Sequence, residues 1–188
     1  MSFRPGETDP MIDAGLKRVI GQMTYGVNVV ACTSQGVTRA YTSTWTYQLG
    51  FEDPIVGISI SPKHDTYSLI DREGWFTVSL LAGDQIEPAQ YFSYPGRRFK
   101  HIGDYIEVVE GNPVVRDCVG WMRVSVSDRL AISDHQLLVG EVVEVGEGRL
   151  KEPALTYSSR KGWRISDTPA RQPGESVRDR LLQMLEEE

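Results

Sequence analysis

Residues 26–46 read GVNVVACTSQGVTRAYTSTWT, and this stretch decides the fold. The run from Val27 to Thr33 is short, apolar and rich in β-branched residues, which is typical of a buried strand. Ser34-Gln35-Gly36 has the composition of a turn, and an extended pattern resumes over residues 37–42. We therefore predict a β-hairpin whose second strand leads into a run of hydroxyl-bearing residues.

Strand signals continue along most of the chain. Further strands are expected at residues 54–61, 75–81, 105–110, 119–128 and 136–146, with a last pair at 154–157 and 162–165. The pattern lacks the regular alternation of strands and helices that a doubly wound parallel sheet requires. Many short strands with few helices predict a mainly β protein, a closed or nearly closed β-barrel with helical appendages.

Two short internal helices are expected between the strands. Asp65 or Thr66 is placed to cap a helix that runs to residue 71. Asp84, with Glu87 three residues later, resembles a capping box for a helix that reaches residue 92.

The two ends of the chain also carry helical signals. Pro10 predicts the first turn of an amphipathic helix that ends near residues 25–26. A polar, proline- and glycine-rich linker then follows the last strand, and residues 176–185 have an apolar helical face. We predict one domain over residues 1–166, and a linker with a C-terminal helix over residues 167–188. This helix either packs on its own barrel or serves as a dimer arm.

Composition excludes several classes of protein. The chain has 188 residues, with 26 acidic and 20 basic side chains and a formal net charge of −6, so general nucleic-acid binding is not expected. It contains neither an apolar run long enough to cross a membrane nor a signal-peptide pattern, which predicts a cytoplasmic protein. Two cysteines and three histidines without metal-ligand spacing predict neither a disulfide framework nor a metal site.

Two polar segments follow predicted strands and are candidate binding loops. Thr42-Ser43-Thr44-Trp45 offers hydroxyls for a phosphate or a polyol and an indole to cover a ring, but composition alone favours a threonine-rich strand end with one core aromatic. Ser61, Lys63, His64 and Thr66 surround a predicted helix N-terminus, where free N–H groups and a lysine suit a phosphate. An ordinary capped helix explains this second segment equally well.

Two further clusters carry charge. Residues 96–101 form the densest basic cluster in the chain, which suits either a surface loop or an anionic ligand. Asp134-His135 precedes a strand, where the histidine is a candidate proton donor or anion sensor and, more often, a turn residue.

In order along the chain, these segments resemble the flavin-reductase-like family, whose fold is the FMN-binding split β-barrel. The resemblance spans roughly residues 12–165. The matching segments are Gly26 to Val30, Thr42 to Trp45 with Asp53-Pro54, Ser61 to Thr66, Gly74 to Leu81, and Asp134-His135 with Gly140 to Val142. The chain departs from the family pattern at Tyr41, where methionine is common, and at His64, where arginine is common.

The resemblance implies a role for each candidate. Thr42, Ser43, Thr44 and Trp45 match the loop around the ribityl chain and ring of FMN. Ser61, Lys63, His64 and Thr66 match the loop at its phosphate. Arg98 and Phe99 match a basic-aromatic pair, and His135 matches a histidine near the reactive face. FMN, with FAD as an alternative, and a homodimer with FMN near the subunit interface are further implications.

The expected activity is hydride transfer from NAD(P)H to FMN, with His135 as the candidate catalytic residue and an oxygenase or a protein electron acceptor as partner. Two alternatives stay open. One is a flavoredoxin-type electron carrier with tightly bound FMN. The other, more distant, is a non-redox or haem-binding split-barrel module.

Overall fold

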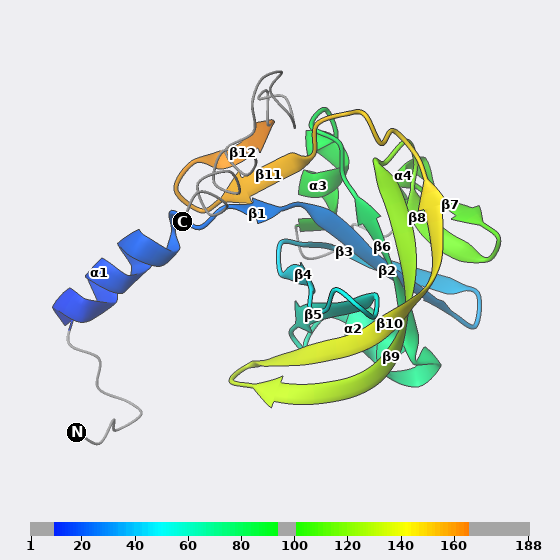
Figure 1. The fold of residues 1–188 in the computed structure, drawn as a ribbon, viewed down its shortest axis with the longest axis horizontal. Helices are drawn as coiled ribbons and strands as arrows, with labels where there is room; N and C mark the ends of the chain where they lie inside the picture. The colour runs from blue at the N-terminus through cyan, green and yellow to red at the C-terminus, as the bar shows by residue number, and fades with distance from the viewer. Residues whose placement is uncertain (1–9, 94–100, 166–188) are drawn as a thin grey trace, which may run out of the picture.

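The computed structural model describes residues 10–93 and 101–165, and its main feature is one curled antiparallel sheet (Figure 1). Seven strands form this sheet, in the order β3 (Val37–Ser43), β2 (Asn28–Ser34), β6 (Trp75–Leu80), β9 (Gly120–Ile132), β10 (His135–Glu147), β5 (Ile55–Ile60) and β4 (Thr46–Gln48). The prediction of a mainly β, barrel-like fold is confirmed.

Smaller elements surround this sheet. Two small sheets comprise β1 (Tyr25–Gly26), β11 (Leu155–Ser158) and β12 (Gly162–Ile165), and β7 (Ile106–Val109) with β8 (Asn112–Val115). The helices are α1 (Pro10–Ile20), α2 (Asp65–Glu73), α3 (Ile86–Ser93) and α4 (Ile102–Tyr105). Figure 1 shows α1 extending away from the barrel.

The barrel is split between its two edge strands, β3 and β4. They end the strand order of the sheet at opposite sides, yet they follow each other in the chain, separated only by Thr44 and Trp45. These two residues therefore cross the split. An edge strand presents backbone N–H and C=O groups that no neighbouring strand pairs, so the split is a natural place for a ligand.

The predicted hairpin of β2 and β3 is confirmed in detail. The two strands pair antiparallel from Asn28 opposite Ser43 to Ser34 opposite Val37. Gln35 and Gly36 connect them with φ angles of 50° and 75°. Positive φ at both central residues is the geometry of the two-residue turn that matches the twist of paired strands.

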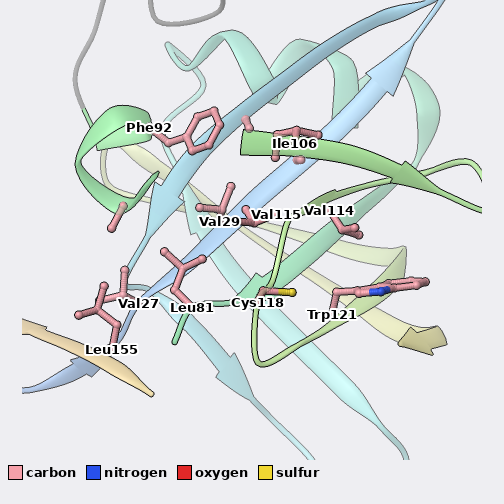
Figure 2. Packing of buried hydrophobic residues seen from close by; sticks show 13 residues of the cluster. Val27, Val29, Leu81, Phe92, Ile106, Val114, Val115, Cys118, Trp121 and Leu155 are labelled. Carbon is pink, nitrogen blue, oxygen red and sulfur yellow. The ribbon is translucent and has the colours of Figure 1, made fainter. Parts of the chain in front are cut away.

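Strand β2 is buried on both faces because it separates two hydrophobic clusters. Val30 and Cys32 pack into the cluster of the barrel interior, together with Ile58, Phe76 and Leu138. Val29 and Ala31 face the opposite way and belong to the cluster beside α3 and β8. Figure 2 shows Val29 in this cluster. Alternation along a strand sends successive side chains to opposite faces, so a run of apolar residues here supplies two cores.

The predicted helix caps are wrong. His64 is the N-cap of α2 and its side chain makes no capping hydrogen bond. The Asp84 carboxylate accepts two hydrogen bonds from the Arg149 guanidinium, and the Glu87 carboxylate accepts one from the Tyr105 hydroxyl. Partners distant in sequence therefore take the acceptors that the expected capping box would use.

Other differences from prediction concern where helices and strands end and which short elements are present. Helix α1 ends at Ile20 rather than near residue 25, and β9 continues four residues beyond the predicted end at residue 128. Strands β4 and β8 and helix α4 were not expected, and Pro113 within β8 weakens a strand signal. Cys32 and Cys118 are both buried, with exposed fractions of 0% and 4%.

Some predictions fall outside the described residues. These are Arg98, Phe99, most of the basic cluster at residues 96–101, and the linker with its C-terminal helix at residues 167–188. The division of the chain at residue 166 stays a prediction. Among the described helices, none has the length and apolar character needed to span a membrane.

Candidate functional site

A cavity of about 190 Å³ opens at the split of the barrel, and we call it the split cavity. Strand β3, its continuation, the end of β5, the loop before α2 and the start of β10 contribute its walls. The lining residues are Tyr41, Thr42, Ser43, Thr44, Trp45, Ser59, Ile60, Ser61, His64 and His135. Seven of the predicted site residues thus meet in one place.

Strand pairing brings these distant segments together. Gln136 pairs with Ile60, so His135 lies at the end of β5. On the other side of β5, the Ser59 N–H donates to the Trp45 carbonyl at 3.0 Å. The Trp45 and His135 rings consequently meet edge to face, with centroids 5.1 Å apart. The register of three strands therefore places an indole and an imidazole at the cavity.

The hydroxyls of β3 hold the loop in place. Thr42 donates through Oγ1 to the Ala89 carbonyl at 2.6 Å, which ties β3 to α3. Ser43 Oγ accepts from the Trp45 N–H at 3.3 Å and from the Thr46 hydroxyl at 3.1 Å. The Thr42 and Ser43 hydroxyls therefore stabilise the strand end and its loop, as a purely structural role would require, although both residues line the cavity.

The four predicted residues in and after the loop before α2 do not all reach the cavity. Ser61 and His64 line the cavity, and the His64 N–H donates to the Ser61 carbonyl at 2.9 Å. Lys63 is exposed and Thr66 is fully buried, and neither contributes to the lining. Because His64 provides no side-chain cap, the first turn of α2 keeps N–H groups and a partial positive charge for an anion.

Tyr41 lines the cavity although the sequence did not point to it as a site residue. Its ring lies against that of His64, with centroids 4.7 Å apart. Its hydroxyl is buried and has no hydrogen-bond partner within the described residues. Burial raises the pKa of the Tyr41 hydroxyl, and the nearby Ser43 hydroxyl opposes this shift weakly. Its sequence signals are its position directly before Thr42 and the departure from the family pattern, where methionine is common.

His135 is oriented by its neighbour. Its Nδ1 lies 2.9 Å from the Asp134 carboxylate. The hydrogen bond with His135 lowers the pKa of Asp134, with a smaller contribution from the charge of Lys63. An ionised carboxylate only accepts, so Nδ1 carries the proton in this contact and Nε2 is left for a ligand.

A second hollow lies on another part of the surface, and we call it the charged groove. Its volume is about 340 Å³, and it is lined by Asp84, Gln85, Glu87, Pro88, Asp104, Tyr105, Val115, Arg116, Asp117 and Arg149. Several of its polar groups bond to each other or to the backbone. Besides Asp84, Arg149 donates through Nε to the Asp117 carbonyl at 2.7 Å. The Tyr105 hydroxyl donates a hydrogen bond to the Glu87 carboxylate, and this bond raises the pKa of Tyr105 to about 12.

No cluster of three or more histidine, cysteine, aspartate or glutamate side chains suited to a metal ion occurs within residues 10–93 and 101–165. The donors around the split cavity instead suit an organic anion. Hydroxyls, a helix N-terminus and a nearby lysine fit a phosphate, and Trp45 fits a planar ring. The residues present therefore fit FMN.

Comparisons with known proteins agree with this architecture. The reductase component of a 4-nitrophenol monooxygenase from Rhodococcus opacus is 27% identical over 154 residues, 81% of this chain and 82% of that protein. The reductase component of a 4-hydroxyphenylacetate 3-monooxygenase from Thermus thermophilus is 30% identical over 144 residues, 77% and 91% of the two chains.

Solved structures show the same fold. The NADH:FAD oxidoreductase of Streptomyces globisporus, in complex with NAD and FAD fragments, superposes with a TM-score of 0.75 at 21% identity over 88% of this chain and 99% of that one. A flavin reductase domain protein from Arthrobacter gives 0.75 at 22% identity, covering 86% and 99%. The model of the flavin reductase like domain matches residues 20–164, so the chain belongs to the flavin-reductase-like family.

Proposed function

We propose that this protein is an NAD(P)H:flavin oxidoreductase that binds FMN in the split cavity. One observation carries the proposal. The rings of Trp45 and His135 and the N-terminus of α2, which suits a phosphate, meet at one cavity. Membership of the flavin-reductase-like family supports the same activity. When bound, the flavin supplies the redox chemistry as acceptor of the hydride from reduced nicotinamide.

The proposed contacts divide the cavity into two ends. The segment from Thr42 to Trp45 holds the ring and ribityl chain, and Ser61, Lys63 and His64 hold the phosphate. Thr66 belongs to this second end through its place in the first turn of α2, and its buried hydroxyl has no hydrogen-bond partner within the described residues. Arg98 and Phe99 remain proposed contacts from outside the described residues.

His135 is proposed to position the reacting groups and to hold a proton beside them. Asp134 fixes the tautomer and the orientation of its ring, which leaves Nε2 as the atom that meets the ligand. The edge of Trp45 packs against the same ring and limits its rotation. Excluding water and keeping two rings at reaction distance are the remaining tasks of the protein.

A second copy of the chain is proposed to complete the site. The split cavity is smaller than the 300 to 1,000 Å³, roughly, of typical small-molecule sites. Apolar side chains beside it are exposed, among them Trp45 at 42%, Leu49 at 50%, Phe51 at 99% and Ile132 at 47%. Exposed large apolar side chains in the segments that flank a site are typical of an interface. Sedimentation of the purified protein checks the homodimer, and a monomer would contradict it.

The electrons are proposed to serve an oxygenase. Both relatives described above are reductase components of monooxygenases. Use of NADH or NADPH as the hydride donor and a cytoplasmic location stay predictions.

Turnover is the direct test of the activity. Purified protein is mixed with FMN or FAD and with NADH or NADPH, and oxidation of the nicotinamide is followed. We expect FMN-dependent oxidation with one or both donors. A tightly held yellow flavin that NAD(P)H does not reduce would favour the flavoredoxin-type alternative, and a red protein with a Soret band would favour haem binding.

A further inference from the structure

The hydroxyl of Tyr41 is a donor without an acceptor. The residue is 4% exposed, and the hydroxyl oxygen has no hydrogen-bond partner within the described residues. The neighbouring Ser43 hydroxyl can donate to the Tyr41 oxygen, but it already accepts from Trp45 and Thr46 and so does not serve as the acceptor for the phenol. A buried polar group without a partner costs stability, so an arrangement of this kind needs an explanation from function.

The surroundings of Tyr41 indicate which ligand group supplies the acceptor. Its ring packs on His64, the N-cap of α2, so the phenol belongs to the helix end of the cavity rather than to the Trp45 end. Ser61, in the loop before this helix, also lines the cavity. With the N–H groups of the first helical turn, these side chains form a donor-rich corner, which selects an anionic acceptor.

We propose that Tyr41 is a specificity-determining residue that donates a hydrogen bond to the phosphate of the bound flavin, and so favours FMN over riboflavin. This inference rests on the proposed function, because it assigns a further contact within the proposed flavin site. Burial raises the pKa of the Tyr41 hydroxyl, so the group stays a donor throughout the neutral range.

Access to this hydroxyl depends on His64. The imidazole is only partly buried, lines the split cavity and lies against the Tyr41 ring. The proposal requires this one side chain to shift as the phosphate settles on the helix end, so that the phenol comes into reach.

The test replaces Tyr41 with phenylalanine. It measures the dissociation constants of FMN and riboflavin and the melting temperature of the flavin-free protein. For Tyr41→Phe we expect the FMN dissociation constant to rise about tenfold to a hundredfold, because a hydrogen bond to a charged group is lost. The dissociation constant of riboflavin, which has no phosphate, stays the same. The melting temperature of the flavin-free variant rises by about 2–4 °C, because the unpartnered hydroxyl is gone.

Tyr105→Phe is the matched control. It removes a tyrosine hydroxyl that is exposed and bonded to Glu87 in the charged groove. We expect FMN and riboflavin to bind to this variant as they do to the wild type.

The outcomes separate the two proposals. Equal weakening of FMN and riboflavin, or no weakening of FMN, by Tyr41→Phe would overturn the inference and leave the flavin site intact. A wild-type protein that binds neither flavin would overturn the inference and the proposed function together.

Discussion

The split cavity and the charged groove differ in what their polar groups do. The groove is the larger, at about 340 Å³ against about 190 Å³, but its Arg149 is taken by Asp84 and Asp117, and its Tyr105 by Glu87. The split cavity instead keeps the buried donor of Tyr41 and an uncapped helix N-terminus. Unsatisfied polar groups, rather than volume, therefore distinguish the hollow built for a ligand.

Strand β10, which carries His135 to the split cavity, is the part of this arrangement where we expect a substitution to lower stability most. A Cβ atom on Gly140 would overlap the backbone carbonyl of Ser125, beside the register shift between β9 and β10. We expect Gly140→Ala to lower the free energy of unfolding by about 3 kcal/mol or more, because neither strand can yield.

Urea unfolding measures this effect, and Gly103→Ala in α4, beside the groove, is its control. A Cβ atom at Gly103 would meet nothing within 4 Å. We expect a change within about 0.5 kcal/mol for that variant. Equal losses from both variants would contradict the account of the strand.

Cations near the two hollows are expected to affect FMN differently. Lys63→Ala should raise the FMN dissociation constant about tenfold, with a weaker effect at high salt, because an exposed charge beside the phosphate is lost. Arg149→Ala should leave FMN binding unchanged, since Arg149 is committed to Asp84. Fluorescence titration compares the two. A larger loss from Arg149→Ala would move the flavin site to the groove.

Two of the three histidines, His135 and His101, give a similar comparison in turnover. His135→Ala should reduce kcat about twofold to tenfold, as expected when one positioning hydrogen bond is lost. His101→Ala, whose imidazole faces Asp104 outside the split cavity, should leave kcat unchanged. Steady-state oxidation of reduced nicotinamide at saturating FMN distinguishes them, and an unaffected His135→Ala variant would remove His135 from the mechanism.

The smallest expected effect concerns the ion pair of the groove. The hydrogen bond from Arg149 lowers the pKa of Asp84 in the folded protein. Its stabilisation is therefore present above the unfolded pKa, near 3.9, and is lost as pH falls through the lower folded value. Asp84→Asn should cost about 1 kcal/mol or less at pH 7, since the pair is solvent-exposed.

Urea unfolding at neutral and at acidic pH tests this prediction. The difference between wild type and Asp84→Asn should shrink at acidic pH. A difference that grows on acidification would contradict the direction of the pKa shift.

The sequence predicted what local patterns determine. The hairpin of β2 and β3 follows from its composition and its turn, and the candidates in the segments at residues 42–45 and 61–64 follow from strand ends. The predicted capping box at Asp84 is wrong because Arg149, far along the chain, takes the carboxylate of Asp84. Tyr41 was missed because its unpartnered hydroxyl is a property of tertiary packing, which no local pattern encodes.

The structure of a complex with FMN tests the central claim most directly. The account predicts the flavin ring beside Thr44 and Trp45, the phosphate at the N-terminus of α2 near His64, and a second copy covering the exposed side. Flavin bound in the charged groove, or a complex whose split cavity holds no flavin, would contradict it.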